Sequence, residues 1–374
     1  MQTRFGIAAL AAALAAAPAC GDLKNSTVPV DAAAYAPDGT LVLFTAAGIY
    51  VFDEELKTNG RRILLDALGD PPYAGAFRYS LSPDGTAAAV SYALSEAGIK
   101  SRAAVYRIAD GSLLNTFEID DAGTPGQGHE LLDLALSPRG DLLYAFSQGG
   151  AGRKANMIDT ATGQSIWARD TTMRLPVWSS DGTMLFGSDY SASDLQLEAL
   201  DPTTGSARWS VSLNGFSVDG LAVVADGTML TAPSRDGASC VPPDGPTSCP
   251  LVYPLWSTAD GSLSKVLPTV PGTSTYGTNP NGYAAFACSP HDVCAVGLAD
   301  FNGDMNRSLV RVYRTDGTGL QTFYTPKSVG SLALSPDGQL IAIAADSVDL
   351  GGVGVFRVDT GALVGSRIFR WDTF

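Results

Sequence analysis

A short turn sequence returns seven times along the chain, and this repetition constrains the fold more than any other feature. Its clearest form is Ser-Pro-Asp-Gly, at residues 82–85 and 335–338. The residues at the Pro position of the seven copies are Pro37, Pro83, Pro138, Ser180, Ala225, Pro290 and Pro336. The intervals between them are 46, 55, 42, 45, 65 and 46 residues. A period of this length indicates one supersecondary unit repeated around a ring or along an array.

Each copy of the turn lies between two predicted strands. Proline presets the backbone for a tight turn, aspartate accepts local bonds, and apolar runs flank the turn at 331–334 and 340–344. A second turn, of the form seen at 159–163, follows about 20 residues later with a strand on each side. Four such strands cannot bury both faces alone, but radial stacking buries them. The sequence therefore predicts an all-β, seven-bladed β-propeller of four-stranded antiparallel blades as a single domain over 31–374.

These turns carry a resemblance to a known superfamily. The Ser-Pro-Asp-Gly hairpins look like those of YVTN and WD-like propellers, and 158–167 and 200–209 are similar to the repeat of quinoprotein-like propellers. The resemblance implies that Trp167 and Trp209 pack between blades. It covers nearly the whole chain. It says almost nothing about function, because propellers have many unrelated activities. Two ways of closing the ring stay open, namely packing of the end blades and an extra edge strand from 26–30.

The first 19 residues have the form of an export signal, a short basic start followed by an apolar run of Phe5–Ala17. Ala17-x-Ala19 fits plain secretion. The segment also resembles a bacterial lipoprotein signal, in which Cys20 would carry the lipid. The chain has five cysteines, and removing Cys20 leaves an even number. We therefore expect a lipoprotein signal peptide at 1–19, a tether at 20–30, and a lipid-anchored protein of the bacterial cell envelope.

The other four cysteines lie where the repeat is interrupted. Cys240 and Cys249 bound a Pro- and Gly-rich insertion, which predicts a disulfide-closed loop. Cys288 and Cys294 flank the sixth turn, at positions that align with Leu334 and Leu340 of the seventh blade. Opposed strand positions lie at disulfide distance, so we expect a second bridge there. Cross-pairing of the two pairs stays open, because connectivity does not follow from sequence alone.

A polar segment in the sixth blade is the sharpest candidate for a metal site. Asp300, Asn302 and Asp304 are similar to the ligands of calcium loops in FG-GAP-type propellers, and Ca²⁺ prefers several such oxygens. Met305 and Arg307 depart from that pattern. The alternative interpretation is an ordinary polar turn between two strands. No other cofactor is expected.

The composition and the absence of known motifs argue against several classes of function, but they do not identify a ligand. A formal net charge of −14 argues against a nucleic-acid partner. The chain has two histidines, and no nucleophile-elbow, zinc-protease or phosphate-loop motif occurs. We therefore expect a monomeric, non-catalytic scaffold that binds a protein partner in the envelope. The alternative is a propeller enzyme, a quinone-dependent dehydrogenase or lactonase-like hydrolase, with its site in the central channel.

Overall fold

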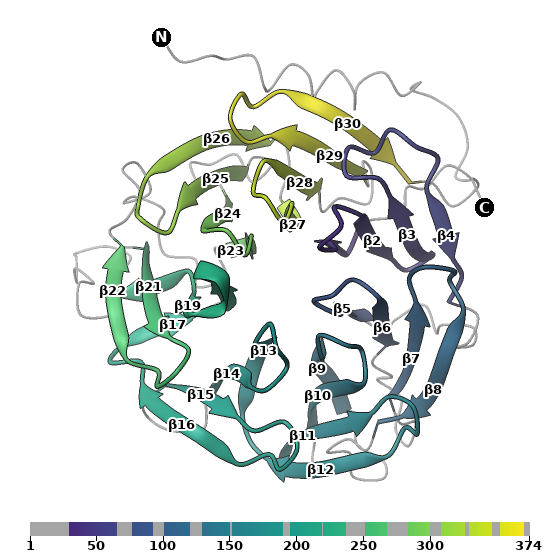
Figure 1. Cartoon of the computed structure of the whole chain (residues 1–374), viewed down its shortest axis with the longest axis vertical. Coiled ribbons are helices and arrows are strands. Elements are labelled where there is room, and N and C mark those ends of the chain that lie inside the picture. The colour runs from purple at the N-terminus through teal and green to yellow at the C-terminus, as the bar shows by residue number, and fades with distance from the viewer. Residues whose placement is uncertain are drawn as a thin grey trace.

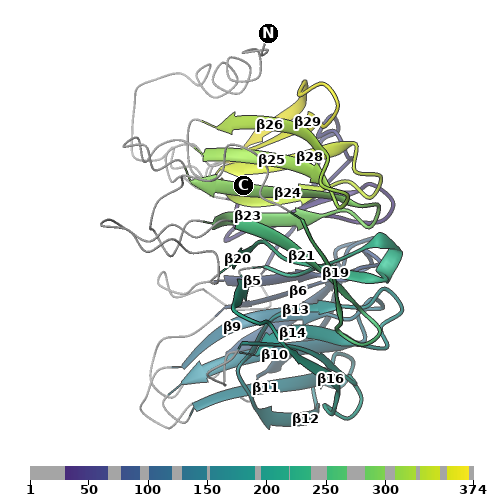
Figure 2. The same ribbon diagram turned by 90° about the vertical axis from the view of Figure 1, so that its left-hand side faces the viewer.

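Seven antiparallel sheets surround a central axis, which confirms the predicted propeller (Figure 1). From the side, the strands of each blade run between the two faces of the disc (Figure 2). The computed structural model describes residues 30–65, 77–92, 101–119, 129–149, 152–189, 195–218, 220–236, 251–267, 283–299, 308–325, 329–345 and 352–369. No helix in these ranges is long and apolar enough to span a bilayer.

Within six of the blades the four strands follow one another in chain order, from the axis outward. The first two blades contain β1 (Ala32–Tyr35), β2 (Leu41–Thr45), β3 (Gly48–Phe52), β4 (Arg61–Ile63), β5 (Phe77–Leu81), β6 (Ala87–Tyr92), β7 (Arg102–Arg107) and β8 (Leu113–Glu118). The third and fourth contain β9 (His129–Leu136), β10 (Leu142–Gly149), β11 (Gly152–Asp159), β12 (Ser165–Asp170), β13 (Met173–Trp178), β14 (Leu185–Asp189), β15 (Gln196–Leu200) and β16 (Ala207–Ser212). The sixth and seventh contain β23 (Tyr283–Cys288), β24 (Val293–Ala299), β25 (Ser308–Arg314), β26 (Gly319–Thr325), β27 (Val329–Leu334), β28 (Leu340–Ala345), β29 (Gly352–Arg357) and β30 (Leu363–Ile368).

Blade five keeps this plan, but its two inner strands are each broken in two. Its elements are β17 (Phe216–Val218), β18 (Ala222–Val224), a 3-10 turn η2 (Ala225–Gly227), β19 (Met229–Thr231), β20 (Ser234–Asp236), β21 (Leu251–Ser257) and β22 (Leu263–Leu267). β18 pairs with β19 and β17 with β20, so the halves continue one another. Pro233 lies at the break in the second strand, where it has no N–H to give to the ladder.

The burial of the strands explains their composition. The second strand of a blade is covered by neighbours on both faces, and β2 is buried along its whole length. Such strands are continuous apolar runs rather than alternating ones. The outer strands β8, β12 and β16 share an alternating pattern of exposed and half-buried residues, because one face of each meets solvent. The second strand of a blade is therefore apolar throughout, whereas the outermost strand mixes polar and apolar residues.

The Ser-Pro-Asp-Gly turn is held by its own side chains. In blade two the Ser82 hydroxyl donates to Asp84 Oδ1 at 2.6 Å, and the Thr86 N–H donates to the same oxygen at 3.0 Å. The Ala87 N–H donates to Ser82 Oγ at 3.0 Å. Gly85 takes a φ of 74°, which glycine adopts without cost. The aspartate and serine thus satisfy backbone groups that the turn would otherwise leave unpaired.

The two repeat tryptophans pack between blades, as the resemblance implies. Trp167 Nε1 donates to the Pro202 carbonyl at 2.8 Å, and Trp209 Nε1 donates to the Thr258 carbonyl at 3.1 Å. Each indole lies against the turn glycine of the next blade. A Cβ on Gly205 would stand 2.8 Å from the Trp167 ring. The second repeated turn is therefore a docking point for the outer strand of the preceding blade.

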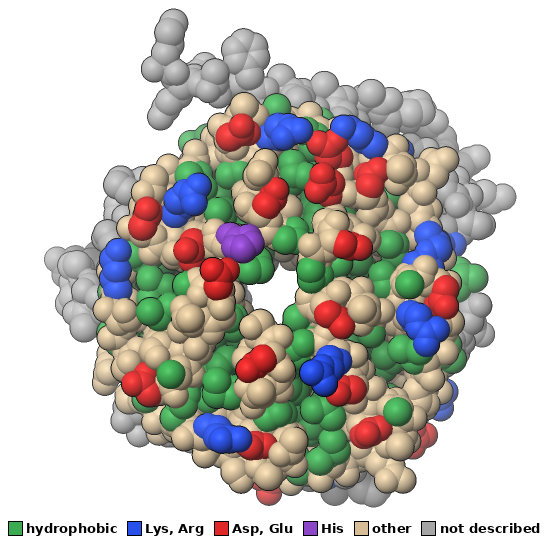
Figure 3. Space-filling view, in the orientation of Figure 1, with side chains coloured by type: hydrophobic (Ala, Val, Ile, Leu, Met, Phe, Trp, Pro, Cys, Tyr) green, Lys and Arg blue, Asp and Glu red, His purple; other side chains and the backbone are tan. Residues whose placement is uncertain are grey.

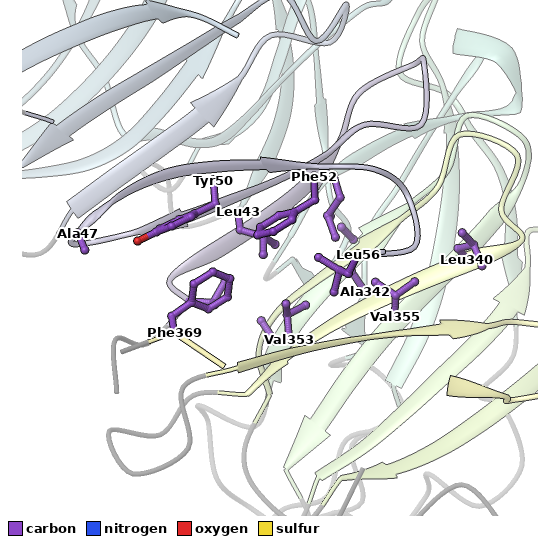
Figure 4. Packing of buried hydrophobic residues seen from close by; sticks show 14 residues of the cluster. Leu43, Ala47, Tyr50, Phe52, Leu56, Leu340, Ala342, Val353, Val355 and Phe369 are labelled. Atoms are coloured by element: carbon purple, nitrogen blue, oxygen red, sulfur yellow. The ribbon is translucent and has the colours of Figure 1, made fainter. Parts of the chain in front are cut away.

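Within the described residues the two end blades pack directly against each other, as one of the two alternatives left by the sequence predicts. The other alternative, an edge strand from 26–30, falls almost entirely outside the described residues. The end blades, β1–β4 and β27–β30, are each built from consecutive strands. Their cluster includes Leu43, Tyr50, Val353 and Phe369 (Figure 4). The Ala33 N–H donates to Ser331 Oγ at 2.9 Å across the junction. We call this junction the closing interface.

Candidate functional site

The inner strands of the blades surround a central channel that is open in the space-filling view (Figure 3). All seven turns between the first and second strands are described and lie at one mouth of this channel. The connections at the opposite ends of the strands fall largely outside the described residues. The site can therefore be built from two parts, the mouth that bears the turns and the channel wall.

Acidic side chains gather around the turn-bearing mouth (Figure 3). Four turns place an aspartate at the same position, with its carboxylate accepting the backbone N–H two residues later: Asp38, Asp84, Asp181 and Asp337. The N–H of Thr183, followed by the Ser179 hydroxyl, lowers the pKa of Asp181. These aspartates are exposed and held in fixed positions. The mouth thus presents a rigid array of negative charge, and we call these four residues the inner acidic ring.

His291 has a partner that the sequence did not reveal. Its Nδ1 lies 3.2 Å from Asp226 Oδ1, and both side chains are exposed. The two residues occupy equivalent positions in the turns of blades five and six. The Ala225 N–H also donates to Asp292 Oδ1 at 3.0 Å, so the two turns are joined. Alignment of the turns would have placed these residues side by side at the mouth.

A charged cluster lies in the channel wall, on the inner strands of blades two, three and four. Arg174 Nε lies 3.1 Å from Asp133 Oδ2, and Arg78 Nε donates to the Leu132 carbonyl at 2.9 Å. Burial raises the pKa of Asp133, although Arg174, Arg78 and the Leu175 N–H oppose the shift. None of these residues belongs to a motif that can be recognised in the sequence. Two guanidinium groups beside one carboxylate can bind an anion.

A second charged cluster is buried between blades three and four. Arg169 Nη2 lies 2.9 Å from Glu198 Oε2, and Arg169 Nη1 donates to the Gly205 carbonyl at 3.0 Å. The Thr172 hydroxyl donates to Asp189 Oδ1 nearby. Burial raises the pKa of Glu198, and Arg169 opposes the shift. These contacts join neighbouring blades, so we assign the cluster to the interface and not to ligand binding.

Among the predicted site residues, only one cysteine pair lies in the described part of the chain. Cys288 and Cys294 form a disulfide with an S–S distance of 2.05 Å, and they are direct partners across β23 and β24. The predicted alignment with Leu340 is off by one residue. In blade seven Leu334 pairs with Ile341, because the sixth turn is one residue shorter.

The remaining predicted site residues, which are Cys20, Cys240, Cys249, Asp300, Asn302 and Asp304, lie outside the described residues. In the ranges that the structure does describe, no group of three or more His, Cys, Asp or Glu side chains is placed to hold a metal ion.

The fold defines the class of the protein as a seven-bladed β-propeller, and solved propeller structures resemble it. A chain of Kuenenia stuttgartiensis hydrazine synthase is similar to it with a TM-score of 0.62 and 16% identity, over 91% of this chain and 99% of that chain. A chain of the mitotic checkpoint complex follows with a TM-score of 0.58 and 14% identity, over 91% and 97%. The propeller domain of Myceliophteria thermophila Cps50 (Swd1) has a TM-score of 0.59 and 12% identity, over 89% and 98%. No family model and no curated protein matches the sequence. At these identities the similarity is one of fold.

Proposed function

We propose that the protein is a lipid-anchored, non-catalytic scaffold of the bacterial cell envelope that binds a protein partner at its turn-bearing face. The signal-like segment at 1–19 and Cys20 support export and anchoring. The Cys288–Cys294 disulfide is typical of an oxidising compartment. Similar propellers include a chain of the mitotic checkpoint complex, which is an assembly of proteins. The proposal makes the propeller a rigid platform held at a membrane surface.

The observation that carries this proposal is the inner acidic ring. Its carboxylates are exposed, yet each is fixed by a bond to its own turn. Charges fixed before binding lose little conformational entropy when a partner docks. Complementary charge also speeds encounter and selects the partner. The partner should therefore present a basic protein surface.

The test uses substitutions that remove charge but keep the turns. An asparagine side chain can accept the same backbone hydrogen bond, so the fourfold change Asp38→Asn, Asp84→Asn, Asp181→Asn and Asp337→Asn should fold normally. The matched control removes four charges from the outer turns, with Asp110→Asn, Asp159→Asn, Asp201→Asn and Asp260→Asn. Tagged full-length chains are cross-linked in the producing cells, and the captured proteins are quantified by mass spectrometry.

We expect a captured protein with a basic surface that the inner variant loses and the outer variant keeps. Equal capture by the two variants would refute the docking face, and capture of no protein above a tag-only control would refute the scaffold. Anchoring is tested separately by Cys20→Ser, which should move the protein out of the membrane fraction. A variant that stays in that fraction contradicts lipidation.

A further inference from the structure

We propose that the turn-bearing face points away from the membrane that holds Cys20, so that the partner at this face is a water-soluble basic protein or domain. The proposal rests on the lipid anchor of the proposed function. It adds the orientation of the disc and the side from which a partner approaches, and the anchor alone determines neither.

The described chain begins on the face opposite the turns. β1 runs toward the first turn, so its start lies at the other end of blade one. The Asp31 N–H donates to the Phe44 carbonyl at 2.9 Å, at the end of β2 that is far from that turn. Val30 is 1% exposed and packs in the closing interface. The chain therefore leaves the propeller at a fixed point on this face, and we call the face on which β1 begins the anchor face.

The tether is too short to bring the turn-bearing face onto the bilayer by a path around the rim. Ten residue steps separate Cys20 from Val30, and a fully extended chain of this length spans at most about 36 Å. Because β1 is the innermost of four strands, the path first crosses three strand spacings, about 14 Å. It then follows the height of the disc, which is about 26 Å for an eight-residue strand such as β10. The whole path of about 40 Å exceeds the reach of the tether.

The open channel offers a shorter path, but it does not provide a route for the tether. The chain would have to pass through a ring formed by its own blades (Figure 3). Threading of this kind is essentially absent from folded proteins. The bilayer therefore does not lie against the turn-bearing face.

The charge of the turn-bearing face favours the same orientation. The turns between third and fourth strands lie on this face too, and five of them hold an aspartate by a hydrogen bond from a backbone N–H: Asp110, Asp159, Asp201, Asp260 and Asp316. Together with the inner acidic ring, they repel an anionic membrane surface and attract a basic protein surface. The partner that these charges select therefore reaches the turns from the aqueous side.

The test measures fluorescence energy transfer from the two ends of one strand to the membrane. The full chain, purified with its lipid, is inserted into preformed phosphatidylethanolamine–phosphatidylglycerol vesicles with an acceptor dye on the lipid headgroups. A donor dye is attached to an azide-bearing amino acid placed at Gln164 or Asp170, exposed residues at the turn end and the anchor end of β12. A second pair, Thr318 and Tyr324 at the corresponding ends of β26 in blade six, reports any tilt of the disc.

We expect transfer from position 170 to exceed transfer from position 164 about twofold, because the two ends of β12 lie about 20 Å apart along the strand. The same ratio is expected for position 324 over position 318. The matched control inserts about 20 glycine and serine residues after Ser26, which extends the reach of the tether beyond the path around the rim. Both ratios should then fall toward one.

Three results would overturn the proposal and leave the anchor intact. The first is an equal or reversed ratio in both pairs of the vesicle-bound wild type. The second is opposite ratios in the two pairs, which would mean that the disc stands on its rim. The third is unchanged ratios in the lengthened chain, which would mean that the tether does not set the orientation. If a label in one pair disturbs the fold, as circular dichroism would show, the other pair decides.

Failure of the anchor is a separate outcome of the same experiment. The wild type should float with the vesicles, and Cys20→Ser should not. If the two chains float equally, the lipid anchor of the proposed function is refuted, and the orientation falls with it.

Discussion

Replacing Phe369 by alanine tests whether the ring is held closed by side-chain packing. Phe369 is 6% exposed and lies with its ring centroid 4.8 Å from that of Tyr50 and 6.2 Å from that of Phe52. It comes from the end of blade seven, whereas both partners come from blade one (Figure 4). Truncating a buried phenylalanine to alanine costs about 3–5 kcal/mol in lost transfer energy and residual cavity. We expect Phe369→Ala to lower the free energy of unfolding by about that amount.

The assay is urea unfolding followed by circular dichroism and tryptophan fluorescence. The matched control is Tyr324→Ala in β26, where the side chain is 55% exposed. A surface change of this kind usually stays within about 0.5 kcal/mol. If Phe369→Ala costs no more than Tyr324→Ala, then packing at the closing interface does not hold the ring, and the reasoning is refuted.

Two further predictions concern the blade interfaces. Gly205→Ala should lower the free energy of unfolding in urea by about 1–3 kcal/mol more than Gly215→Ala does. Both glycines have a positive φ, but only at Gly205 would a Cβ meet the Trp167 ring. Equal losses of stability in the two variants would contradict the packing of Trp167 against this turn. The second concerns Glu198, whose pKa is raised by burial, so protonation of its carboxyl favours the folded state. The stability of the wild type relative to Glu198→Gln should therefore fall as the pH rises from about 4 to about 7, and a pH-independent difference would contradict the buried position.

The number of blades could be predicted from the turns, because the hydrogen bonds that hold each turn come from residues within a few positions of one another. In blades two, four and seven a serine donates to an aspartate two residues later, so the hairpin is held by residues of the turn itself. A turn of this kind can therefore be recognised and counted in the sequence. The one-residue shortening of the sixth turn was not visible in the same way. There Asp292 adopts a φ of 63° in place of the usual glycine, and the pairing of Cys294 shifts with it.

The channel cluster was missed for a different reason. Arg78, Asp133 and Arg174 lie far apart in the sequence and none belongs to a motif. Counting residues back from each turn would have aligned Arg78 with Asp133. The same counting would have placed Arg174 one position away from the level of Arg78 and Asp133, because nothing in the sequence around Leu175 indicates the bulge. The sequence also left the mode of ring closure open, because both alternatives use the same strands of the end blades.

The closing interface also sets the order in which the ring can fold. Within a blade each strand pairs with one that precedes or follows it closely in the sequence, so these contacts close short segments of chain. Contacts across the closing interface join residues 298 to 309 positions apart, such as Ala33 with Ser331 and Arg367 with Thr58. Closing so long a segment costs more chain entropy and slows the step. The seven blades should therefore form and stack one after another. The apolar residues of blade one at the closing interface should stay exposed to solvent until blade seven has formed and packs against them.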